Sequence, residues 1–417
     1  MLDINYIRDQ RQQVKQACED KQLDSSVVDK LLEADEKRRE LKAQVDDVRR
    51  QINANADEIK KKVQKGGKPD AKLIAKGKDL KEQLKKVEPD FRQAKEKYVE
   101  LMLQIPNVAA AEVPVGKDET DNQVVRQEGV LPEFEFTPLP HQELMEKLDW
   151  VDTERGVKIA GFRGYFLKNK AVLLEQALLR YALDLMVKHG FTPMTVPTLV
   201  NKPALEGTGY FPWGADDHYY TQDDTILAGT AEVALTAYYG DETLREDDLP
   251  IKLTGISPCY RREVGAHGQD TQGIIRVHQF NKVEQVMLTV ADEKETAKWH
   301  EKMLGYAEEL LQNLGLPYQV LLMCTGDMGA GQRKKYDLET WFPGQNKYRE
   351  THSASYFNDF QARRLNIRYQ AKDGSTKFVY TINNTVAASP RLLAAIIENY
   401  QQADGTVKVP EVLKAYL

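Results

Sequence analysis

The segments LKAQVDDVRRQINANADEI (residues 41–59) and LKEQLKKVEPDFRQAKEKYVEL (residues 80–101) decide the fold of the first part of the chain. In both, apolar residues recur at steps of three and four, which is the heptad spacing of a coiled coil. The turn Gly66-Gly67-Lys68-Pro69 separates them, so the pattern predicts two helices that fold back as an antiparallel hairpin. Each limb of about 35 residues would be on the order of 50 Å long. The predicted seam consists of Leu41, Val45, Val48, Ile52, Ile59, Leu80, Leu84, Val87, Phe91, Ala94, Tyr98 and Leu101.

Basic residues are concentrated in this hairpin. Residues 60–100 contain 14 Lys and Arg against 7 Asp and Glu, whereas the whole chain of 417 residues has a formal net charge of −6. Such an excess on an exposed arm is typical of RNA binding through phosphate contacts, although lysines on the outer faces of coiled coils are also often only solvated. The candidate contacts are Lys60, Lys61, Lys62, Lys65, Lys72 and Lys76.

The composition is ordinary for a protein with a long exposed helical element, with 41% apolar and 29% charged residues. No run of about 18 apolar residues occurs and residues 1–15 are charged, so we expect no membrane span, no signal peptide and a cytoplasmic location. Cys18, Cys259 and Cys324 are odd in number and form no C-x-x-C pair. They therefore predict neither a disulfide framework nor a structural zinc site.

Beyond the hairpin the chain changes character. Residues 105–140 contain five prolines and are expected to form an extended connector. Strands then do not alternate regularly with helices, so we predict an α+β domain with an antiparallel β-sheet flanked by helices rather than a doubly wound parallel sheet. The predicted parts are residues 1–104, 105–140 and 141–417. Within the last part we expect a helix at 171–189 and strands at 191–196, 251–256, 283–290 and 377–382.

Familiar nucleotide-binding and hydrolase motifs are missing from the sequence, namely G-x-x-x-x-G-K-[ST], G-x-G-x-x-G before a helix, a nucleophile elbow and H-E-x-x-H. Nucleotide chemistry would therefore need another kind of binding site. One segment, which contains Gly265, Gly268 and Gly273, has the residue types that such a site needs. An arginine can neutralise a phosphate, an aromatic ring can stack on adenine, and a carboxylate can accept from an amino group. Taken singly, each of these residues is as readily explained as part of a surface ion pair or as a core side chain. The residues are Arg261, Arg262, Glu263, Arg276, Phe280 and Glu284.

Three shorter clusters have weaker signals. Glu350-Thr351-His352-Ser353 places a carboxylate and a hydroxyl three residues apart, which suits a divalent ion that holds nucleotide phosphates. Thr230-Ala231-Glu232 is equally well explained as a helix N-cap followed by an acidic first turn. Asn383-Asn384-Thr385 is also typical of a turn.

In this order, these segments resemble the seryl-tRNA synthetases, which are class II aminoacyl-tRNA synthetases, over essentially the entire chain and in the bacterial form with an N-terminal coiled-coil arm. Gly190-Phe191 with Pro197, residues 261–284 and residues 388–391 resemble the three class-defining motifs. The other matching segments are Ile105-Pro106-Asn107, Val113-Pro114, Gly116, Asp118-Glu119, Asp121-Asn122, Thr230-Ala231-Glu232, residues 359–364 and Glu398-Asn399-Tyr400-Gln401.

The resemblance implies a two-step reaction. The carboxylate of L-serine attacks the α-phosphate of ATP to give seryl-adenylate, and the 3′ end of serine tRNA then takes the seryl group. It further implies Mg²⁺ with ATP and a homodimer, in which the arm of one subunit presents tRNA to the site of the other. The resemblance leaves open whether selenocysteine tRNA is charged as well. None of the cysteines matches the metal-binding cysteine of the zinc-dependent branch, so no zinc is expected.

Residue roles also follow from the resemblance. Arg261 would hold the α-phosphate and the serine carboxylate, and Glu263 would hold the adenine amino group. Phe280 and Arg391 would lie on the two faces of adenine, with Arg261 and Arg391 as the catalytic residues. Serine would be bound by Thr230, Ala231, Glu232, Arg261, Glu284, Asn383 and Thr385. ATP would also contact Arg262, Arg276, Val277, Glu350, Thr351, His352 and Ser353, with Glu350 and Ser353 as ligands of Mg²⁺.

Some residues depart from the family pattern. Thr351-His352-Ser353 stands where consecutive serines are usual, and Val386-Ala387-Ala388-Ser389-Pro390-Arg391-Leu392 replaces a glycine-rich third motif. Two alternatives therefore stay open. One is an amino acid:carrier-protein ligase on the same core, but those relatives lack the hairpin. The other is a non-catalytic, synthetase-like RNA-binding protein. Against it, the charged residues of the family pattern all remain, namely Arg261, Glu263, Glu284, Glu350 and Arg391.

Overall fold

The computed structural model describes residues 1–68, 70–264 and 273–417. The chain divides into two compact units. One comprises Leu2–Glu19 and Leu23–Ile105, and the other comprises Met1, Asp20–Gln22 and Pro106–Leu417. Within the described ranges, no helix has the length and apolar character needed to span a membrane.

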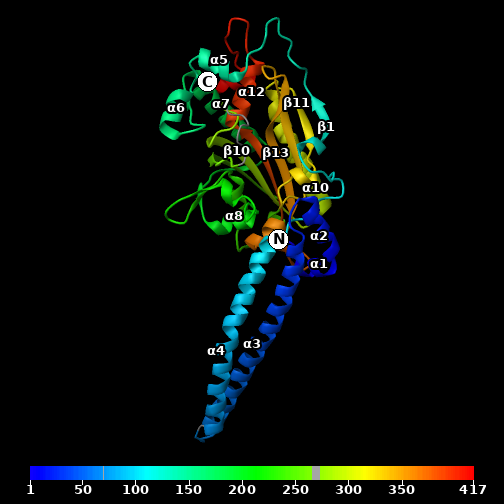
Figure 1. The fold of residues 1–417 in the computed structure, drawn as a ribbon, viewed down its shortest axis with the longest axis vertical. Coiled ribbons are helices and arrows are strands. Elements are labelled where there is room, and N and C mark those ends of the chain that lie inside the picture. The colour runs from blue at the N-terminus through cyan, green and yellow to red at the C-terminus, as the bar shows by residue number, and fades with distance from the viewer. Residues whose placement is uncertain (69, 265–272) are drawn as a thin grey trace. The chain divides into compact units, whose positions relative to one another are not determined.

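Two long helices dominate the first unit. They are α3 (Ser26–Gln64) and α4 (Ala71–Leu103), preceded by α1 (Ile4–Asp9) and α2 (Arg11–Asp20). Figure 1 shows α3 and α4 as a hairpin. Every residue of the predicted seam is buried or half-buried, so the coiled-coil prediction is confirmed. Asp70 caps α4 by accepting a hydrogen bond from the Lys72 backbone N–H at 2.9 Å. Of the predicted turn, Pro69 lies outside the described residues.

Asn55 is a polar residue within the apolar seam of the hairpin. Asn55 is 5% exposed and donates from Nδ2 to the Leu73 carbonyl at 3.0 Å. A Cβ built at Gly77 would lie 2.9 Å from the same Nδ2 atom. A buried Asn at a seam position favours one register of the two helices. The candidate RNA-contacting lysines, Lys60, Lys61, Lys62, Lys65, Lys72 and Lys76, are all exposed.

A sheet of eight strands, counted over the described residues, forms the centre of the second unit. The strand order is β1-β11-β12-β13-β16-β10-β9-β4, and each neighbouring pair is antiparallel except β4 and β9. This confirms the prediction of an α+β domain on a largely antiparallel sheet. The strands are β1 (Gln123–Glu128), β4 (Thr192–Thr195), β9 (Ile251–Tyr260), β10 (Gln279–Thr289), β11 (Tyr318–Leu322), β12 (Lys334–Phe342), β13 (Lys347–Asn358) and β16 (Tyr380–Ala388).

Two local features differ from the sequence-based picture. The segment 377–382 was expected to form one strand, which is wrong because the chain changes sheets at Val379. Residues before it form β15 (Thr376–Phe378) in a small sheet, and residues after it begin β16 in the central sheet. In addition, β1 lies inside the stretch expected to be an extended connector, and it pairs with β11. The other short strands are β2 (Val151–Asp152), β3 (Phe166–Leu167), β5 (Leu199–Val200), β6 (Tyr219–Tyr220), β7 (Ile226–Leu227), β8 (Thr243–Arg245) and β14 (Arg368–Gln370).

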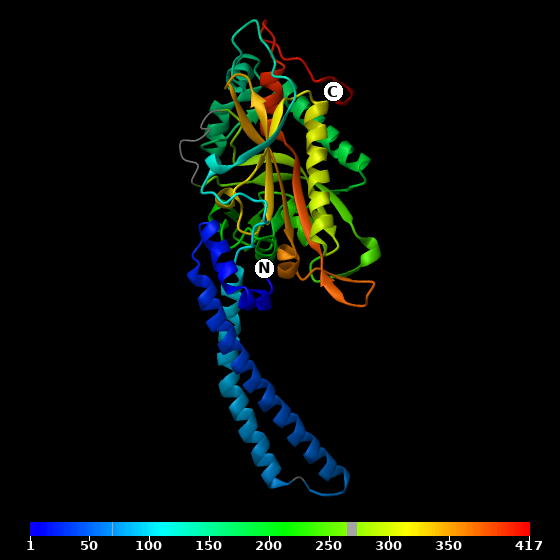
Figure 2. The same ribbon diagram turned by 90° about the vertical axis from the view of Figure 1, so that its right-hand side faces the viewer.

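Helix α10 (Glu293–Asn313) covers one face of the central sheet, along which it runs in Figure 2. Gln285 on β10 and Asn384 on β16 both donate to the Met303 carbonyl of this helix, at 3.0 and 2.8 Å. Because side chains alternate along a strand, the flanking residues of β10 and β16 point to the opposite face. The remaining helices are α5 (His141–Lys147), α6 (Thr153–Ala160), α7 (Lys170–Lys188), α8 (Lys202–Thr208), α9 (Glu232–Ala237), α11 (Phe360–Leu365) and α12 (Ser389–Asn399).

Candidate active site

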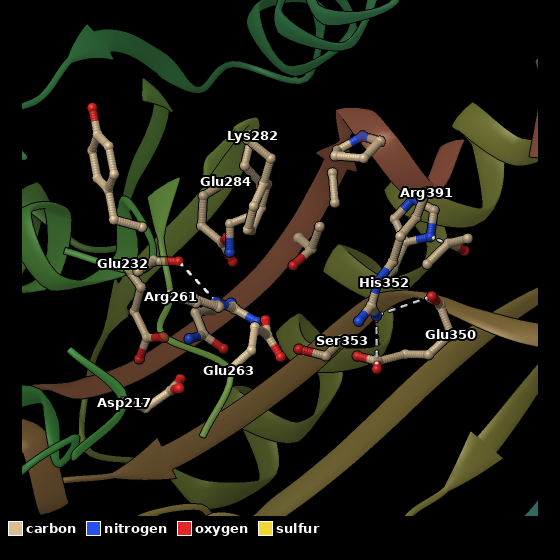
Figure 3. A pocket seen from close by; sticks show the side chains of 18 of the residues that line it. Asp217, Glu232, Arg261, Glu263, Lys282, Glu284, Glu350, His352, Ser353 and Arg391 are labelled. Atoms are coloured by element: carbon tan, nitrogen blue, oxygen red, sulfur yellow. Dashed lines mark hydrogen bonds and ion pairs between the residues drawn. The ribbon is translucent and has the colours of Figure 1, made fainter. Parts of the chain in front are cut away.

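A cavity of about 340 Å³ opens on the face of the sheet away from α10. This volume lies within the roughly 300–1,000 Å³ that is typical of small-molecule sites. Figure 3 shows acidic and basic side chains around it. The predicted residues that line it are Glu232, Arg261, Glu263, Val277, Phe280, Glu284, Glu350, Thr351, His352, Ser353, Asn383, Thr385 and Arg391.

Four predicted site residues lie outside this lining. Thr230 lies just behind it, because its hydroxyl contacts Glu284 at 3.2 Å. Ala231 is 1% exposed and packs in the core beneath the sheet. The guanidinium of Arg262 donates to the Asp216 carbonyl at 2.9 Å, and that of Arg276 pairs with Glu263 at 2.6 Å. Two glycines of the same predicted loop, Gly265 and Gly268, fall outside the described residues.

One end of the cavity is a buried polar pocket built by two paired strands. Glu284 on β10 lies directly opposite Thr385 on β16. The Lys282 ammonium forms an ion pair with the Glu284 carboxylate and donates to the Thr230 hydroxyl at 2.8 Å. Asn383 lies two residues before Thr385, on the same side of β16. Carboxylate, amide and hydroxyl groups thus converge in a space suited to a small molecule with several polar groups.

A second buried carboxylate, that of Glu232 at the start of α9, completes this pocket. It is 4% exposed and accepts from Tyr210 Oη at 2.7 Å and from Gln361 Nε2 at 2.9 Å. Burial, and then the nearby Glu284 carboxylate, raise the pKa of Glu232 to about 7. The carboxyl group can therefore change its charge near neutral pH.

The other end of the cavity presents guanidinium groups and an aromatic ring. Arg261 follows β9, and its Nε donates to the Gly229 carbonyl at 3.3 Å. Its guanidinium carbon lies 5.5 Å from the centre of the Phe280 ring. Register brings these residues together, because Cys259 on β9 pairs with Phe280 on β10. A cation beside an exposed aromatic face can bind an anionic group attached to a flat ring.

Arg391 and Glu350 form an ion pair at this end (Figure 3). The Arg391 Nη1 donates to the Glu350 carboxylate at 2.8 Å and to its carbonyl at 3.0 Å, and Nε donates to the Ile275 carbonyl at 3.4 Å. Burial alone would raise the pKa of Glu350, but the Arg391 guanidinium and the Lys335 ammonium hold that pKa below its usual range. Glu350 is therefore an ionised carboxylate near neutral pH.

The Thr351 and His352 side chains form hydrogen bonds with each other and with other groups of the protein. His352 is 1% exposed, its Nδ1 lies 2.9 Å from the Thr351 hydroxyl, and its Nε2 lies 3.0 Å from the Val386 carbonyl. Because a carbonyl only accepts, Nε2 carries the proton and Nδ1 accepts. Burial lowers the pKa of His352 to about 4, so the ring is neutral. The pair thus joins β13 to β16 beneath the cavity.

Sequence reasoning missed several lining residues. Lys282 lies within residues 261–284, which resemble a class-defining motif, but no role was predicted for it, although its spacing of two from Glu284 on a strand places both on one face. Tyr210 had no such signal, because it reaches Glu232 from a distant segment, as does Gln361, which lies outside the lining. Lys335 on β12 also lines the cavity and pairs with Asp337 at 2.9 Å.

Two protein-family models match the chain. A family model described as the tRNA synthetase class II core domain (G, H, P, S and T) matches residues 217–400, so the second unit has the core of a class II aminoacyl-tRNA synthetase. A second model, the seryl-tRNA synthetase N-terminal domain, matches residues 1–109.

The relatives cover the whole chain. A serine--tRNA ligase of Deinococcus radiodurans is 46% identical over all of this chain and 97% of its own length. The seryl-tRNA synthetase of Pyrococcus horikoshii, solved in complex with ATP, has a TM-score of 0.90 and 39% identity, with 100% of this chain and 98% of that chain covered. The cytoplasmic serine-tRNA ligase of Naegleria fowleri, solved with AMP, has a TM-score of 0.85 and 33% identity over 100% and 97% of the two chains. The chain belongs to the seryl-tRNA synthetase family.

Proposed function

We propose that this protein activates L-serine with ATP and transfers the seryl group to the 3′ end of serine tRNA. The main support is the layout of the cavity in a chain with full-length similarity to serine--tRNA ligases. One end offers buried carboxylates and hydroxyls for an amino acid, and the other offers two arginines and an aromatic ring for a nucleotide. Of these two arginines, Arg261 would meet both the serine carboxylate and the α-phosphate.

In the first step the serine carboxylate attacks the α-phosphate and pyrophosphate leaves. No protein nucleophile is needed, so the site acts by orienting the reactants and stabilising charge. Arg261 would bind both the carboxylate and the α-phosphate, and Phe280 would stack on adenine. Arg391 would lie across adenine from Phe280, near the γ-phosphate. Glu263, held by Arg276, would accept from the adenine amino group.

We assign a Mg²⁺ site to Glu350 and Ser353. Across the part of the chain that the structure describes, no group of three or more His, Cys, Asp or Glu side chains could hold a metal. One ionised carboxylate and one hydroxyl nevertheless suit Mg²⁺, which commonly takes one or two carboxylates together with substrate phosphates. Bound there with ATP, the ion would screen the phosphate charge. Zinc has no role in this proposal.

The polar pocket would select serine. Thr230, Glu232 and Glu284 would surround the ammonium and hydroxyl groups, with Asn383 and Thr385 closing the pocket. A site built to hydrogen-bond a hydroxyl rejects an analogue without it by factors of about 10⁴ to 10⁵, because buried polar groups are then unpaired. Alanine would be excluded in this way, and threonine would be excluded by its size.

We further propose residues 1–104 as the tRNA-binding domain, 105–140 as a connector and 141–417 as the catalytic domain, working in the cytoplasm as a homodimer. The exposed lysines of the hairpin would bind phosphates of serine tRNA. Large apolar side chains between residues 159 and 173 are exposed, and they support the dimer because exposed apolar surface commonly marks protein contacts. Ile159 is 74% exposed, Leu173 57%, Phe162 56% and Phe166 46%.

The deciding experiment is serine-dependent exchange of pyrophosphate into ATP, with alanine, threonine and glycine as competitors, followed by serylation of tRNA. We expect serine-selective exchange that Arg261→Ala reduces by about 10²-fold or more. Arg363→Ala is the matched control, since Arg363 pairs with Asp359 outside the cavity. Exchange without charging of tRNA would favour a carrier-protein ligase, and absence of exchange by the folded protein would favour a non-catalytic relative.

A further inference from the structure

A second buried ionisable pair lies outside the lining of the cavity. His141 begins α5 and is 4% exposed, and Glu398 lies near the end of α12 with no exposed surface. The His141 Nδ1 lies 2.8 Å from a Glu398 carboxylate oxygen. Nothing in the proposed reaction uses either residue directly.

The surroundings of Glu398 fix the tautomer of this histidine. The carboxylate accepts from the backbone N–H groups of His141 and Gly344, both at 2.9 Å, and from the Gln345 amide at 3.1 Å. A carboxylate that accepts these bonds also accepts from the ring, so His141 carries its proton on Nδ1. The Nε2 atom is then an acceptor, and it faces the Ile274 backbone N–H at 3.4 Å.

The ring also lies against the residue before Ile274. Gly273 has φ +74°, a left-handed conformation that favours glycine, and a Cβ built there would overlap the His141 Nε2 atom. The position of this short backbone segment is thus set by the imidazole through one hydrogen bond and one close contact.

The residue after this contact borders the proposed nucleotide site. Ile275 lines the cavity, and its carbonyl accepts from the Arg391 Nε atom that belongs to the Arg391–Glu350 pair. Val277 follows in the same lining. A continuous series of contacts therefore runs from Glu398 through His141 and Ile274 to Ile275 and Arg391.

We infer that His141, oriented by Glu398, is a positioning residue for ATP, because it fixes the backbone at 273–275 against which Arg391 is set. This inference rests on the proposed function for the identity of the ligand. It differs from a purely structural role, in which the pair only joins α5 to α12. In that case its loss would lower stability and leave nucleotide binding unchanged.

The first test measures ATP affinity by titration calorimetry and the KM values for ATP and serine in pyrophosphate exchange, with Tm recorded for every variant. His141→Ala should weaken ATP binding and raise the KM for ATP by roughly five- to tenfold, the size expected for one hydrogen bond. The KM for serine should stay within about twofold. His141→Gln, which can place an acceptor near Nε2, should recover part of the ATP affinity, and Glu398→Gln should resemble His141→Ala.

His300→Phe is the matched control. His300 is also buried, at 1% exposed, but it lies on α10 and stacks on Tyr336 with ring centres 5.3 Å apart. This variant should change Tm without changing the KM for ATP. If His141→Ala, His141→Gln and Glu398→Gln behave in the same way as the control, the inference is overturned.

Gly273→Ala tests whether the effect on ATP passes through the contact between His141 and the backbone at 273–275. Alone, it should weaken ATP binding, since its Cβ displaces the imidazole. In combination with His141→Ala, the loss of ATP affinity should be smaller than the product of the two single losses, because the Cβ then enters vacated space and only the strain of alanine at this left-handed φ remains. Multiplicative effects would overturn the inference. Should the wild type bind ATP without exchanging pyrophosphate, the proposed function fails while ATP affinity still decides the role of His141. Absence of ATP binding by the folded wild type overturns both.

Discussion

Lys282 and Glu284 lie two residues apart on β10 and form an ion pair whose side chains are only 6% and 3% exposed. The same ammonium donates to Thr230 at 2.8 Å, and Thr230 contacts Glu284. These three groups therefore form one closed unit at the end of the cavity that we propose to bind serine. The Glu284 carboxylate depends on the Lys282 ammonium, because removing one partner of a buried ion pair leaves the charge of the other unpaired.

Lys282→Met should therefore lower the free energy of unfolding by about 3–5 kcal/mol and also raise the KM for serine. The double variant Lys282→Met/Glu284→Gln should recover much of the stability but not the serine affinity, since no charge is then left unpaired. Urea unfolding and pyrophosphate exchange measure the two effects. Lys334→Met is the control, because Lys334 is also buried and pairs with Glu112 and Glu301 outside the cavity. An unchanged KM for serine in Lys282→Met would contradict this role.

Glu232 should give the protein a pH-dependent stability. Its pKa of about 7 lies above the usual 4.5, so between these pH values the folded state holds a proton that the unfolded state releases. The stability from this proton is complete below about pH 4.5 and is lost as the pH rises to 7. Glu232→Gln cannot ionise, so its Tm relative to wild type should rise between pH 5 and pH 8. A constant difference in Tm across this range would show that Glu232 does not titrate as proposed.

The KM for serine should depend on the same ionisation. A Glu232 carboxylate attracts the serine ammonium, whereas the protonated form does not, so the KM should fall as the pH rises from about 6 to 8. Glu232→Gln should flatten this dependence and raise the KM. Exchange kinetics at several pH values provide the measurement. A variant that keeps the wild-type pH profile would exclude Glu232 as its source.

Glu350→Gln should raise the Mg²⁺ concentration needed for half-maximal exchange by roughly tenfold, because a neutral amide is a weaker ligand for a hard cation. Glu308→Gln is a matched control, since Glu308 pairs with Arg126 at 2.6 Å as Glu350 pairs with Arg391. It should leave the Mg²⁺ dependence unchanged. Equal Mg²⁺ curves for wild type and Glu350→Gln would remove Glu350 from the metal site.

Charge reversal of Lys60, Lys61, Lys65 and Lys72 should raise the KM for tRNA at least tenfold and flatten its salt dependence, since each lost phosphate contact reduces the counterions released. Pyrophosphate exchange needs no tRNA and should be unaffected. Reversal of the exposed Lys372 and Lys408 in the second unit serves as the control. An equal loss in both reactions would contradict a separate tRNA-binding role of the hairpin.

The hairpin could be predicted from the sequence because its signal is local and repeated. Residues such as Val45 and Leu80 recur over many turns at coiled-coil spacing, and both are buried. The break at Val379 could not be predicted in this way. Both sides of it favour strands, and only pairing of Tyr380 with Thr289 in the central sheet separates them.

The lining of the cavity was predictable where its residues are close in sequence, as with Arg261 and Glu263. It was less so where the fold joins distant segments, since the contact of Gln361 with Glu232 depends on the packing of the whole unit. For Arg262, closeness in sequence to a lining residue was misleading. It follows Arg261 directly, yet its guanidinium is directed to the Asp216 carbonyl outside the cavity lining.

The hydrogen bonds from Gln285 and Asn384 to the Met303 carbonyl support both strands of the pocket that we propose to bind serine. The two strands that carry Glu284 and Thr385 are tied, on their far side, to one oxygen atom of α10. A small displacement of this helix would therefore shift both walls of the pocket together and preserve their spacing. Substitutions beneath α10 could change how tightly serine is held without altering which amino acid is accepted.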